Sequence, residues 1–246
     1  MPQIPERADI IHAALSVAAV APKVNVMYVT GGRDTGAIDS GGAKEKEIDK
    51  ATDQLIADAL RPYVRAYYSE DAGEFFADGE GNTIIAMGDA LDGSSQVDVN
   101  GGGGTILALR AFLQDRSLEG QTGTAILASL FITYGVQTKM IIAVEGVGAF
   151  EFILDIRNNV FYKEREIDLR RAQRKPSMPY RIALGGSRKQ WPKGFPELVD
   201  QWVKQDAVNG YGGALVTDVY GAINHILDGG RAIFAYLANK LRLRYE

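Results

Sequence analysis

The chain has 246 residues, a net charge of −4 and no cysteine. With 46 % hydrophobic and 24 % charged residues, it is typical of a globular protein that folds into one or two compact domains. The acidic balance argues against nucleic acid as a partner. The lack of cysteine excludes disulfides, thiolate metal sites and thiol-based redox control in this chain.

The N-terminal segment places Glu6 and Asp9 before or at the start of a short apolar run, residues 10–20. It lacks the basic start and long apolar core of a secretory signal. We also see no uninterrupted apolar run of roughly 20 residues, the length of a membrane span. We therefore expect a cytoplasmic protein without a membrane partner.

Hydrophobic spacing predicts helices over residues 7–20 and 44–61, with Ile48, Leu55, Ile56 and Leu60 on one face of the second. A glycine-rich loop, residues 30–43, separates the two helices, and Pro62 ends the second. Short apolar runs at hairpin spacing then predict strands over residues 64–69, 84–87, 105–112, 125–134, 140–144 and 150–155.

The basic stretch 165–175 is followed by Pro176 and Pro179, which indicates a boundary between lobes 1–175 and 176–246. In the second lobe, predicted strands 180–184 and 232–236 alternate with predicted helices 196–205 and 215–227. This alternation predicts a layered α/β architecture, of the α+β kind, for the whole chain.

The motif Asp89-Ala-Leu-Asp92-Gly-Ser-Ser95 sets two carboxylates three residues apart directly before Gly-Ser-Ser. Carboxylate oxygens are the ligands that Mg²⁺ prefers, and the N–H groups of Gly-Ser-Ser can bind an oxyanion. Asp49 lies on a predicted helix, and Glu70 and Asp71 follow a predicted strand. Because ligands bind at the carboxyl ends of strands in α/β folds, these acids can converge. Together they indicate divalent-metal-assisted phosphate chemistry, although Glu70-Asp71 alone is also typical of a solvated turn.

The motif resembles the Asp-Pro-Leu-Asp-Gly-Ser-Ser sequence of the class I fructose-1,6-bisphosphatases, members of the lithium-sensitive sugar- and inositol-phosphate phosphatases. Other segments resemble the same family in the family's order, from about residue 44 to 246. These segments are Glu47-Ile-Asp49, Ser69-Glu-Asp71, Tyr211 to Val219, Gly229 to Tyr236 and Lys240 to Glu246.

The resemblance implies a sugar-phosphatase fold: a mostly antiparallel sheet flanked by helices, plus a smaller α/β lobe. The implied reaction, part of carbohydrate metabolism and gluconeogenesis, hydrolyses fructose 1,6-bisphosphate to fructose 6-phosphate and phosphate. The implied cofactors are two or three Mg²⁺ or Mn²⁺ ions per subunit, in a homo-oligomer (dimer or tetramer). Their ligands would be Glu70, Asp71, Asp89, Asp92, Glu246 and the carbonyl of Leu91.

The resemblance also assigns catalytic roles to Asp49 and Glu70, with Asp49 helping to activate the attacking water. The implied substrate-binding residues are Gly93, Ser94, Ser95, Tyr211, Tyr236, Lys240 and Arg242. In the absence of the resemblance, the two tyrosines are typical of packing residues and a lone lysine of a solvated one.

Gly210 stands where many members of the family have an arginine that reaches the distal phosphate of a neighbouring subunit. The sequence therefore predicts a weakened grip on that phosphate, with Arg188 or Lys189 as substitutes. Ala43 likewise replaces a loop aspartate. Relatives continue past the position of Glu246, so we expect further chain there.

Three alternatives stay open. Sedoheptulose 1,7-bisphosphate is a close second substrate, and an inositol-phosphate-type phosphatase belongs to the same superfamily. A metal- and sugar-phosphate-binding protein without turnover is the third alternative.

Overall fold

The computed structural model describes residues 5–31, 34–38, 44–81, 83–112, 125–185 and 188–236. The chain divides into two compact units, with the division between Ile167 and Asp168. The sequence predicts the division near residue 175; segment 168–175 belongs to the second unit.

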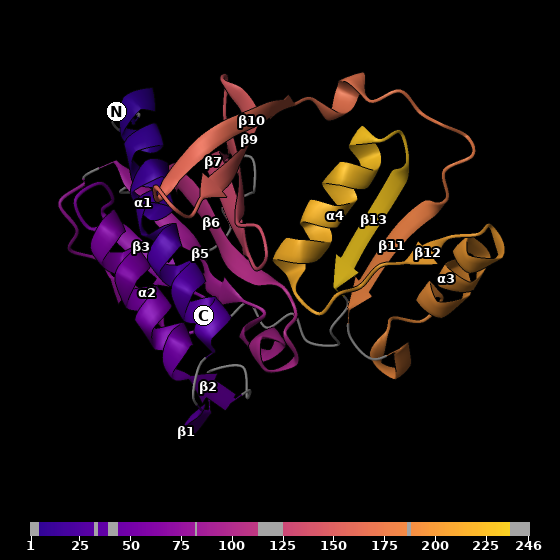
Figure 1. Ribbon diagram of the computed structural model, residues 1–246, viewed down its shortest axis with the longest axis horizontal. Helices are drawn as coiled ribbons and strands as arrows, with labels where there is room; N and C mark the ends of the chain where they lie inside the picture. Colours follow the sequence, from indigo (N-terminus) through magenta and orange to yellow (C-terminus); the bar gives the residue numbers. More distant parts are fainter. Residues whose placement is uncertain are drawn as a thin grey trace. The chain divides into compact units, whose positions relative to one another are not determined.

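The first unit is built on an eight-stranded sheet with the order β10-β9-β8-β7-β6-β5-β3-β4 (Figure 1). Every neighbouring pair is antiparallel except β3 and β5, which are parallel. The strands are β3 (Ala66–Ser69), β4 (Gly73–Phe76), β5 (Ile84–Asp92), β6 (Gly103–Ala111), β7 (Ile126–Tyr134), β8 (Lys139–Val144), β9 (Gly148–Asp155) and β10 (Val160–Ile167). A separate antiparallel pair joins β1 (Asp34–Ile38) to β2 (Lys44–Lys46).

Two helices pack against each other and against this sheet (Figure 1). Helix α1 (Arg7–Thr30) contacts β7 and β8, and α2 (Glu47–Leu60) contacts β3 and β5. The predicted apolar face of α2 is confirmed, since Ile48, Ile56 and Leu60 are buried.

Helix α1 is longer than its predicted span of residues 7–20, because it continues through Pro22 to Thr30. Proline removes a helical hydrogen bond, and the burial of Ala21, Val24 and Tyr28 stabilises the helix beyond that point. By length and hydropathy alone, α1 would also be long and apolar enough to cross a membrane. Half of that apolar stretch is buried inside the unit, which accounts for its composition.

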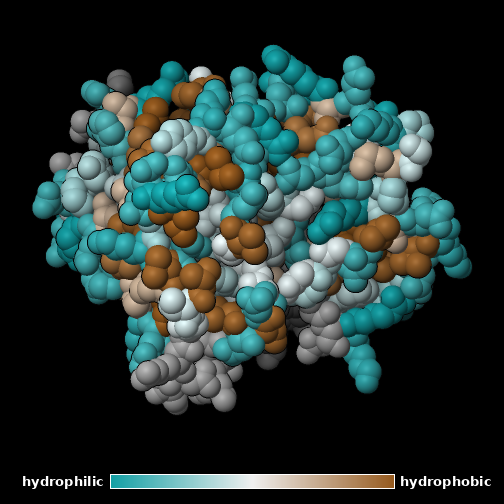
Figure 2. All heavy atoms as spheres, viewed as in Figure 1, coloured by the Kyte–Doolittle hydropathy of each residue, from teal (hydrophilic) through white to brown (hydrophobic). Residues whose placement is uncertain are grey.

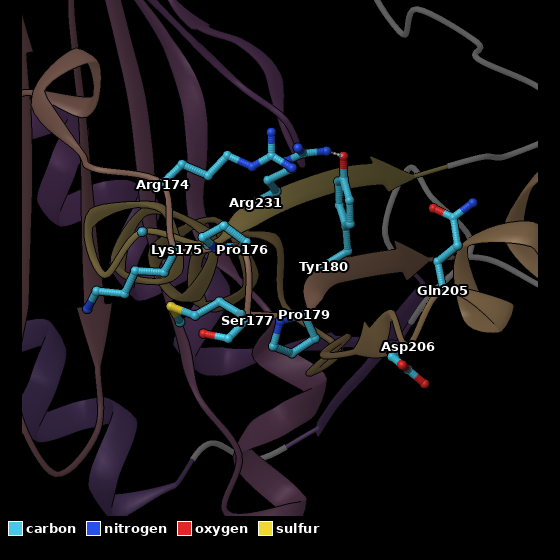
Figure 3. A pocket seen from close by; sticks show the side chains of 12 residues that line it. Arg174, Lys175, Pro176, Ser177, Pro179, Tyr180, Gln205, Asp206 and Arg231 are labelled. Carbon is cyan, nitrogen blue, oxygen red and sulfur yellow. Dashed lines mark hydrogen bonds between the residues drawn. The ribbon is translucent and has the colours of Figure 1, made fainter.

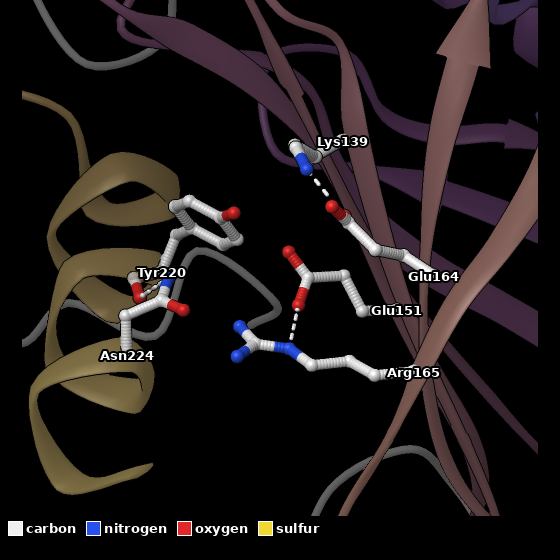
Figure 4. Close-up of polar contacts among 6 residues, drawn as sticks. All are labelled: Lys139, Glu151, Glu164, Arg165, Tyr220 and Asn224. Carbon is white, nitrogen blue, oxygen red and sulfur yellow. Dashed lines mark hydrogen bonds and ion pairs between the residues drawn. The ribbon is translucent and has the colours of Figure 1, made fainter. Parts of the chain in front are cut away.

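Strand β10 is absent from the predicted elements. It follows a turn in which Asn159 has a φ of 53° and lies at the edge of the sheet, where charged residues protect the unpaired backbone. Two ion pairs connect β10 to β8 and to the neighbouring β9, Lys139 of β8 with Glu164 and Glu151 of β9 with Arg165 (Figure 4).

The second unit has a parallel three-stranded sheet with the order β12 (Val208–Asn209), β11 (Tyr180–Gly185), β13 (Arg231–Tyr236). Helix α3 (Phe195–Lys204) packs on it through a small core of Ile182, Leu184 and Val199. Helix α4 (Leu215–Leu227) contacts β11 and β13 and has the predicted bounds. Within α4, the Asn224 side chain donates a hydrogen bond to the Tyr220 carbonyl (Figure 4).

The predicted fold class is therefore confirmed: a mixed α/β chain with a mostly antiparallel sheet and a smaller α/β unit. On the face drawn in Figure 2, hydrophobic residues form separate groups among hydrophilic ones. Scattered apolar residues of this kind are normal on a protein surface.

Candidate active site

Among the described strands of the first unit, the parallel pair β3 and β5 brings acidic residues together. Ser69 at the end of β3 lies opposite Gly88 of β5, and the N–H of Glu70 donates to the Gly88 carbonyl at 2.9 Å. A Cβ at Gly88 would lie 2.0 Å from the carbonyl oxygen of Ile106, so only glycine fits there. The segment Glu70-Asp71 thus leaves the sheet beside Asp89.

Strand β5 continues through both aspartates of the motif, whereas the sequence predicts that it ends at Met87. Pairing with β6 extends it, with Asp89 opposite Ile106 and Asp92 opposite Gly104. The register shifts between the two pairs, and Asp89 Oδ1 accepts the N–H of Leu91 at 2.9 Å. This local irregularity takes Ala90 and Leu91, between the two aspartates, out of the regular ladder.

The electrostatics of Asp89 show how closely the acids are gathered. Its pKa is raised to about 8, first by burial and then by the charges of Asp92, Glu70 and Asp71. Each neighbouring carboxylate disfavours the ionised form of Asp89, and a divalent cation would offset that repulsion. Among the described residues no three acidic side chains are close enough together to hold a metal ion as they stand.

Asp49 lies on the buried face of α2 and lines a cavity of about 310 Å³. Asp71 lines the same cavity, together with Asp53, Lys50 and Phe75. The structure therefore brings the helix carboxylate of Asp49 and the strand-end carboxylate of Asp71 to one cavity of the first unit. This arrangement, of oxygen donors around a space open to a ligand, fits a hard divalent cation.

Sequence analysis missed Asp53, which lies one helical turn after Asp49. Its buried carboxylate accepts hydrogen bonds from the Tyr67 hydroxyl at 2.9 Å and from the Ser69 hydroxyl at 2.6 Å. Burial raises its pKa, the two hydrogen bonds lower it, and the charge of Glu70 raises it further. Since Ser69 directly precedes Glu70, Asp53 fixes the end of β3. The i, i+4 spacing from Asp49 on a buried helix face was the available signal.

The Gly-Ser-Ser segment, residues 93–95, directly follows the end of β5 at Asp92. Gly93 has φ 77° and ψ 31°, a left-handed conformation that favours glycine, and a short 3₁₀ helix η1 (Ser94–Val99) begins after it. Ser94 and Ser95 therefore come directly after Asp92 in a tight turn.

Buried polar contacts support this turn from below. The Thr105 hydroxyl donates to the Ala90 carbonyl at 2.7 Å, and the Tyr28 hydroxyl donates to the Gly101 carbonyl at 3.0 Å. Burial, together with the charge of Asp92, raises the pKa of Tyr28 to about 12. A Cβ at Gly103 would lie 2.7 Å from the Asp92 carbonyl oxygen, so the two segments are in close contact.

The predicted sugar-side residues belong to the second unit and are described only in part. Tyr211 is 40 % exposed, and its N–H donates to Asn209 Oδ1 at 3.2 Å. Tyr236 is the last residue of β13, but its side chain is outside the described part of the structure. Lys240, Arg242 and Glu246 also lie outside the described residues, as does Ala43.

The space beside Gly210 is occupied by another arginine. The guanidinium of Arg181 donates to the Gly210 carbonyl at 3.1 Å, and a Cβ at Gly210 would lie 2.5 Å from Arg181 Cζ. Of the two suggested substitutes, Arg188 forms an ion pair with Asp200 at 2.7 Å, and Lys189 is exposed.

A mostly antiparallel sheet with acidic residues and a Gly-Ser-Ser turn at one edge is the fold and site of the sugar-phosphatase class. Residues 8–166 match the family model described as fructose-1-6-bisphosphatase, N-terminal domain. The chain belongs to the fructose-1,6-bisphosphatase family, a metal-dependent family, so the predicted resemblance is confirmed.

Named relatives agree. A class 1 fructose-1,6-bisphosphatase of Neisseria gonorrhoeae is 29 % identical, over 94 % of this chain and 76 % of that protein. One of Cereibacter sphaeroides is 32 % identical, over 70 % of this chain and 51 % of that protein. Among solved structures, Leishmania major fructose-1,6-bisphosphatase in holo form matches with a TM-score of 0.76 at 20 % identity, covering 96 % of this chain and 77 % of that one. A putative sedoheptulose-1,7 bisphosphatase from Toxoplasma gondii matches with a TM-score of 0.73 at 22 % identity, covering 92 % and 72 %. The structural matches establish the shared fold.

Proposed function

We propose that this chain is a phosphoric monoester hydrolase that converts fructose 1,6-bisphosphate and water into fructose 6-phosphate and phosphate. The observation that carries the proposal is the junction of β3 and β5, where three carboxylates surround that of Asp89 and the Gly93 turn follows at once. Family membership supplies the substrate class, a sugar bisphosphate.

The proposed cofactor is Mg²⁺ or Mn²⁺, two or three ions per subunit. The proposed ligands are the carboxylates of Glu70, Asp71, Asp89, Asp92 and Glu246 and the carbonyl of Leu91. When bound, such ions lower the pKa of water, neutralise the phosphate and stabilise the leaving oxygen. The support from this chain is the gathering of Asp92, Glu70 and Asp71 around Asp89, whose pKa is raised first by burial and then by these negative charges, which a cation would offset.

Asp49 and Glu70 are the proposed catalytic residues. Asp49, together with Glu70, would take the proton of the attacking water, because the two come from α2 and from the end of β3 at the same edge of the sheet. A base has to reach that proton within hydrogen-bonding distance. Asp53 would hold Ser69, and with it Glu70, in position by the hydrogen bonds described above.

The scissile phosphate would be held by the N–H groups of Gly93, Ser94 and Ser95 and by the two serine hydroxyls. The left-handed Gly93 lets successive N–H groups face one oxyanion, as in other anion-binding turns. These donors would lie beside the proposed metal ligands, so the phosphorus would be placed between the activated water and its leaving group.

Tyr211, Tyr236, Lys240 and Arg242 are proposed to bind the sugar and its distal phosphate. We further propose a cytoplasmic location, because a chain without cysteine has no disulfide that a reducing environment would break. We also propose a homo-oligomeric assembly.

Phosphate release from a panel of sugar and inositol phosphates, with Mg²⁺, with Mn²⁺ and with EDTA, tests the proposal. We expect metal-dependent release, fastest from fructose 1,6-bisphosphate and slower from sedoheptulose 1,7-bisphosphate. Preference for an inositol monophosphate would contradict the substrate. Tight binding of fructose 1,6-bisphosphate without release would favour the binding protein that does not turn over.

A further inference from the structure

The second unit contains a cavity of about 240 Å³ that the proposed reaction does not use. It lies at the amino-terminal ends of β11 and β13, whose first residues, Tyr180 and Arg231, are directly opposite each other in the parallel register. Segment 174–180 forms one wall, and Gln205 and Asp206 complete it.

Two arginines line this cavity. In the view of Figure 3 the guanidinium groups of Arg174 and Arg231 lie beside the Tyr180 hydroxyl, while Asp206 points away from them. Asp206 is the one carboxylate in the lining, against the two guanidinium groups and Lys175. Guanidinium groups repel each other, and an anion between them would remove that repulsion and form bidentate hydrogen bonds.

Arg231 is held in place by Tyr180. It donates a hydrogen bond to the Tyr180 hydroxyl, and its guanidinium also lies over the Tyr180 ring, 4.8 Å from the centroid. Since the phenol oxygen accepts this bond, its own proton remains able to donate to a ligand. The pair therefore supplies both a charge and a neutral donor.

Segment 174–180, which carries Arg174, is also held in place. The N–H of Lys175 donates to the Gly229 carbonyl at 2.8 Å, and the N–H of Met178 donates to the Lys175 carbonyl at 3.0 Å. Pro176 and Pro179 limit the backbone further, and His225 Nε2 lies 2.8 Å from the Pro179 carbonyl oxygen. Such preorganisation lowers the entropy cost of binding a ligand.

We propose that this cavity, the Arg174–Arg231 pocket, is a binding site for the phosphate group of a small metabolite. Its volume lies below the range of about 300–1,000 Å³ typical of drug-sized ligand pockets, which favours a free phosphate or a short phosphomonoester. In the absence of metal, the carboxylates at the edge of the first unit repel anions. Phosphate binding to metal-free protein therefore reports the Arg174–Arg231 pocket and not the proposed active site.

The test measures binding of inorganic phosphate and of glycerol 3-phosphate to EDTA-treated protein by titration calorimetry. We expect saturable binding, weakened at least about tenfold by Arg174→Gln, which removes one charged donor. Arg171→Gln is the matched control, because Arg171 is in the same basic stretch and is exposed like Arg174, but it pairs with Asp168 and does not line the pocket. Tighter binding of the ester would assign the pocket to an organic phosphate, and tighter binding of the free anion to inorganic phosphate.

A second measurement locates the bound anion. Phenylglyoxal modifies accessible arginines, and peptide mass spectrometry reports each site separately. Phosphate should protect Arg174 and Arg231 and leave Arg170 and Arg171 reactive. Equal phosphate affinity of Arg174→Gln and wild type, equal weakening by Arg171→Gln, or no saturable binding below about 10 mM would overturn the proposal. Loss of fructose 1,6-bisphosphate hydrolysis is not expected in Arg174→Gln, so failure of the pocket and of the proposed reaction remain distinguishable.

Discussion

Both units use a parallel strand pair to position charged side chains. The first unit gathers negative charges in this way, and the second gathers positive ones. In the first unit, the pairing of β3 with β5 sets Glu70 and Asp71 beside Asp89 at the carboxyl ends of the strands. In the second, the pairing of β11 with β13 sets Arg231 beside Tyr180 at the amino ends, and Arg174 lies across from it. Around Asp89 the like charges cost free energy until a cation binds. The comparison indicates a cation site in one unit and an anion site in the other.

The largest expected effect is on the acidic edge itself. Asp92→Asn should lower turnover of fructose 1,6-bisphosphate at least about 100-fold, because it removes a charged metal ligand beside the Gly93 turn. The circular dichroism spectrum should stay that of wild type, since Asp92 is partly exposed at the end of β5. A rate close to that of wild type, or full wild-type activity in EDTA, would contradict a metal site there.

The raised pKa of Asp89 predicts how the metal-free protein responds to pH. A carboxyl whose pKa is raised from 3.8 to about 8 by folding stabilises the folded state fully below pH 3.8, and that contribution is lost as pH rises toward 8. The melting temperature of EDTA-treated protein should therefore fall between pH 5 and 8, on the order of 5 °C. Added Mg²⁺ should reduce the fall, because it favours the ionised carboxylate.

Asp89→Asn removes this titration and should flatten the same pH profile. Glu80→Gln, at an exposed position, should leave the slope unchanged. If Asp89→Asn shows the wild-type slope, another group titrates over this range, and the crowding of carboxylates around Asp89 is not its cause.

A smaller effect is expected at Asp53. Asp53→Ala leaves the hydroxyls of Tyr67 and Ser69 buried without their acceptor, which costs about 1–3 kcal/mol of unfolding free energy for each group. Asp53→Asn keeps an acceptor oxygen and should lose less. Because Ser69 precedes Glu70, the affinity for Mn²⁺, measured by calorimetry, should also fall in Asp53→Ala.

Asp58→Ala is the control, since Asp58 is exposed on the same helix and pairs with Gln54. If the Mn²⁺ affinity of Asp53→Ala equals that of wild type, Asp53 stabilises the fold but does not position Glu70 for metal binding.

Some of these features could be predicted from the sequence and others could not. The bounds of α4 and of the hairpin strands could be predicted, because the hydrophobic periodicity and the turn residues that determine them are visible in the local sequence. Strand β10 could not be found in this way, because its exposed, highly charged residues stabilise a sheet edge and not a core. The acidic motif could be found because its residues are consecutive. The Asp53 network and the Arg174–Arg231 pocket depend on long-range register, to which local sequence gives no access.

The smallest expected effect is at Gly210, where the structure changes the expectation that the sequence supports. The missing family arginine predicts a weak grip on the distal phosphate, but the guanidinium of Arg181 lies against Gly210 and also approaches Gly221. Gly210→Ala should therefore displace Arg181 and cost about 1 kcal/mol of unfolding free energy. Gly210→Arg should lower stability further without improving substrate binding, so the KM for fructose 1,6-bisphosphate should stay within about twofold of wild type. A clear fall in KM for Gly210→Arg, with unchanged KM for Gly210→Ala, would instead show that position 210 reaches the distal phosphate and that Arg181 does not replace the family's arginine.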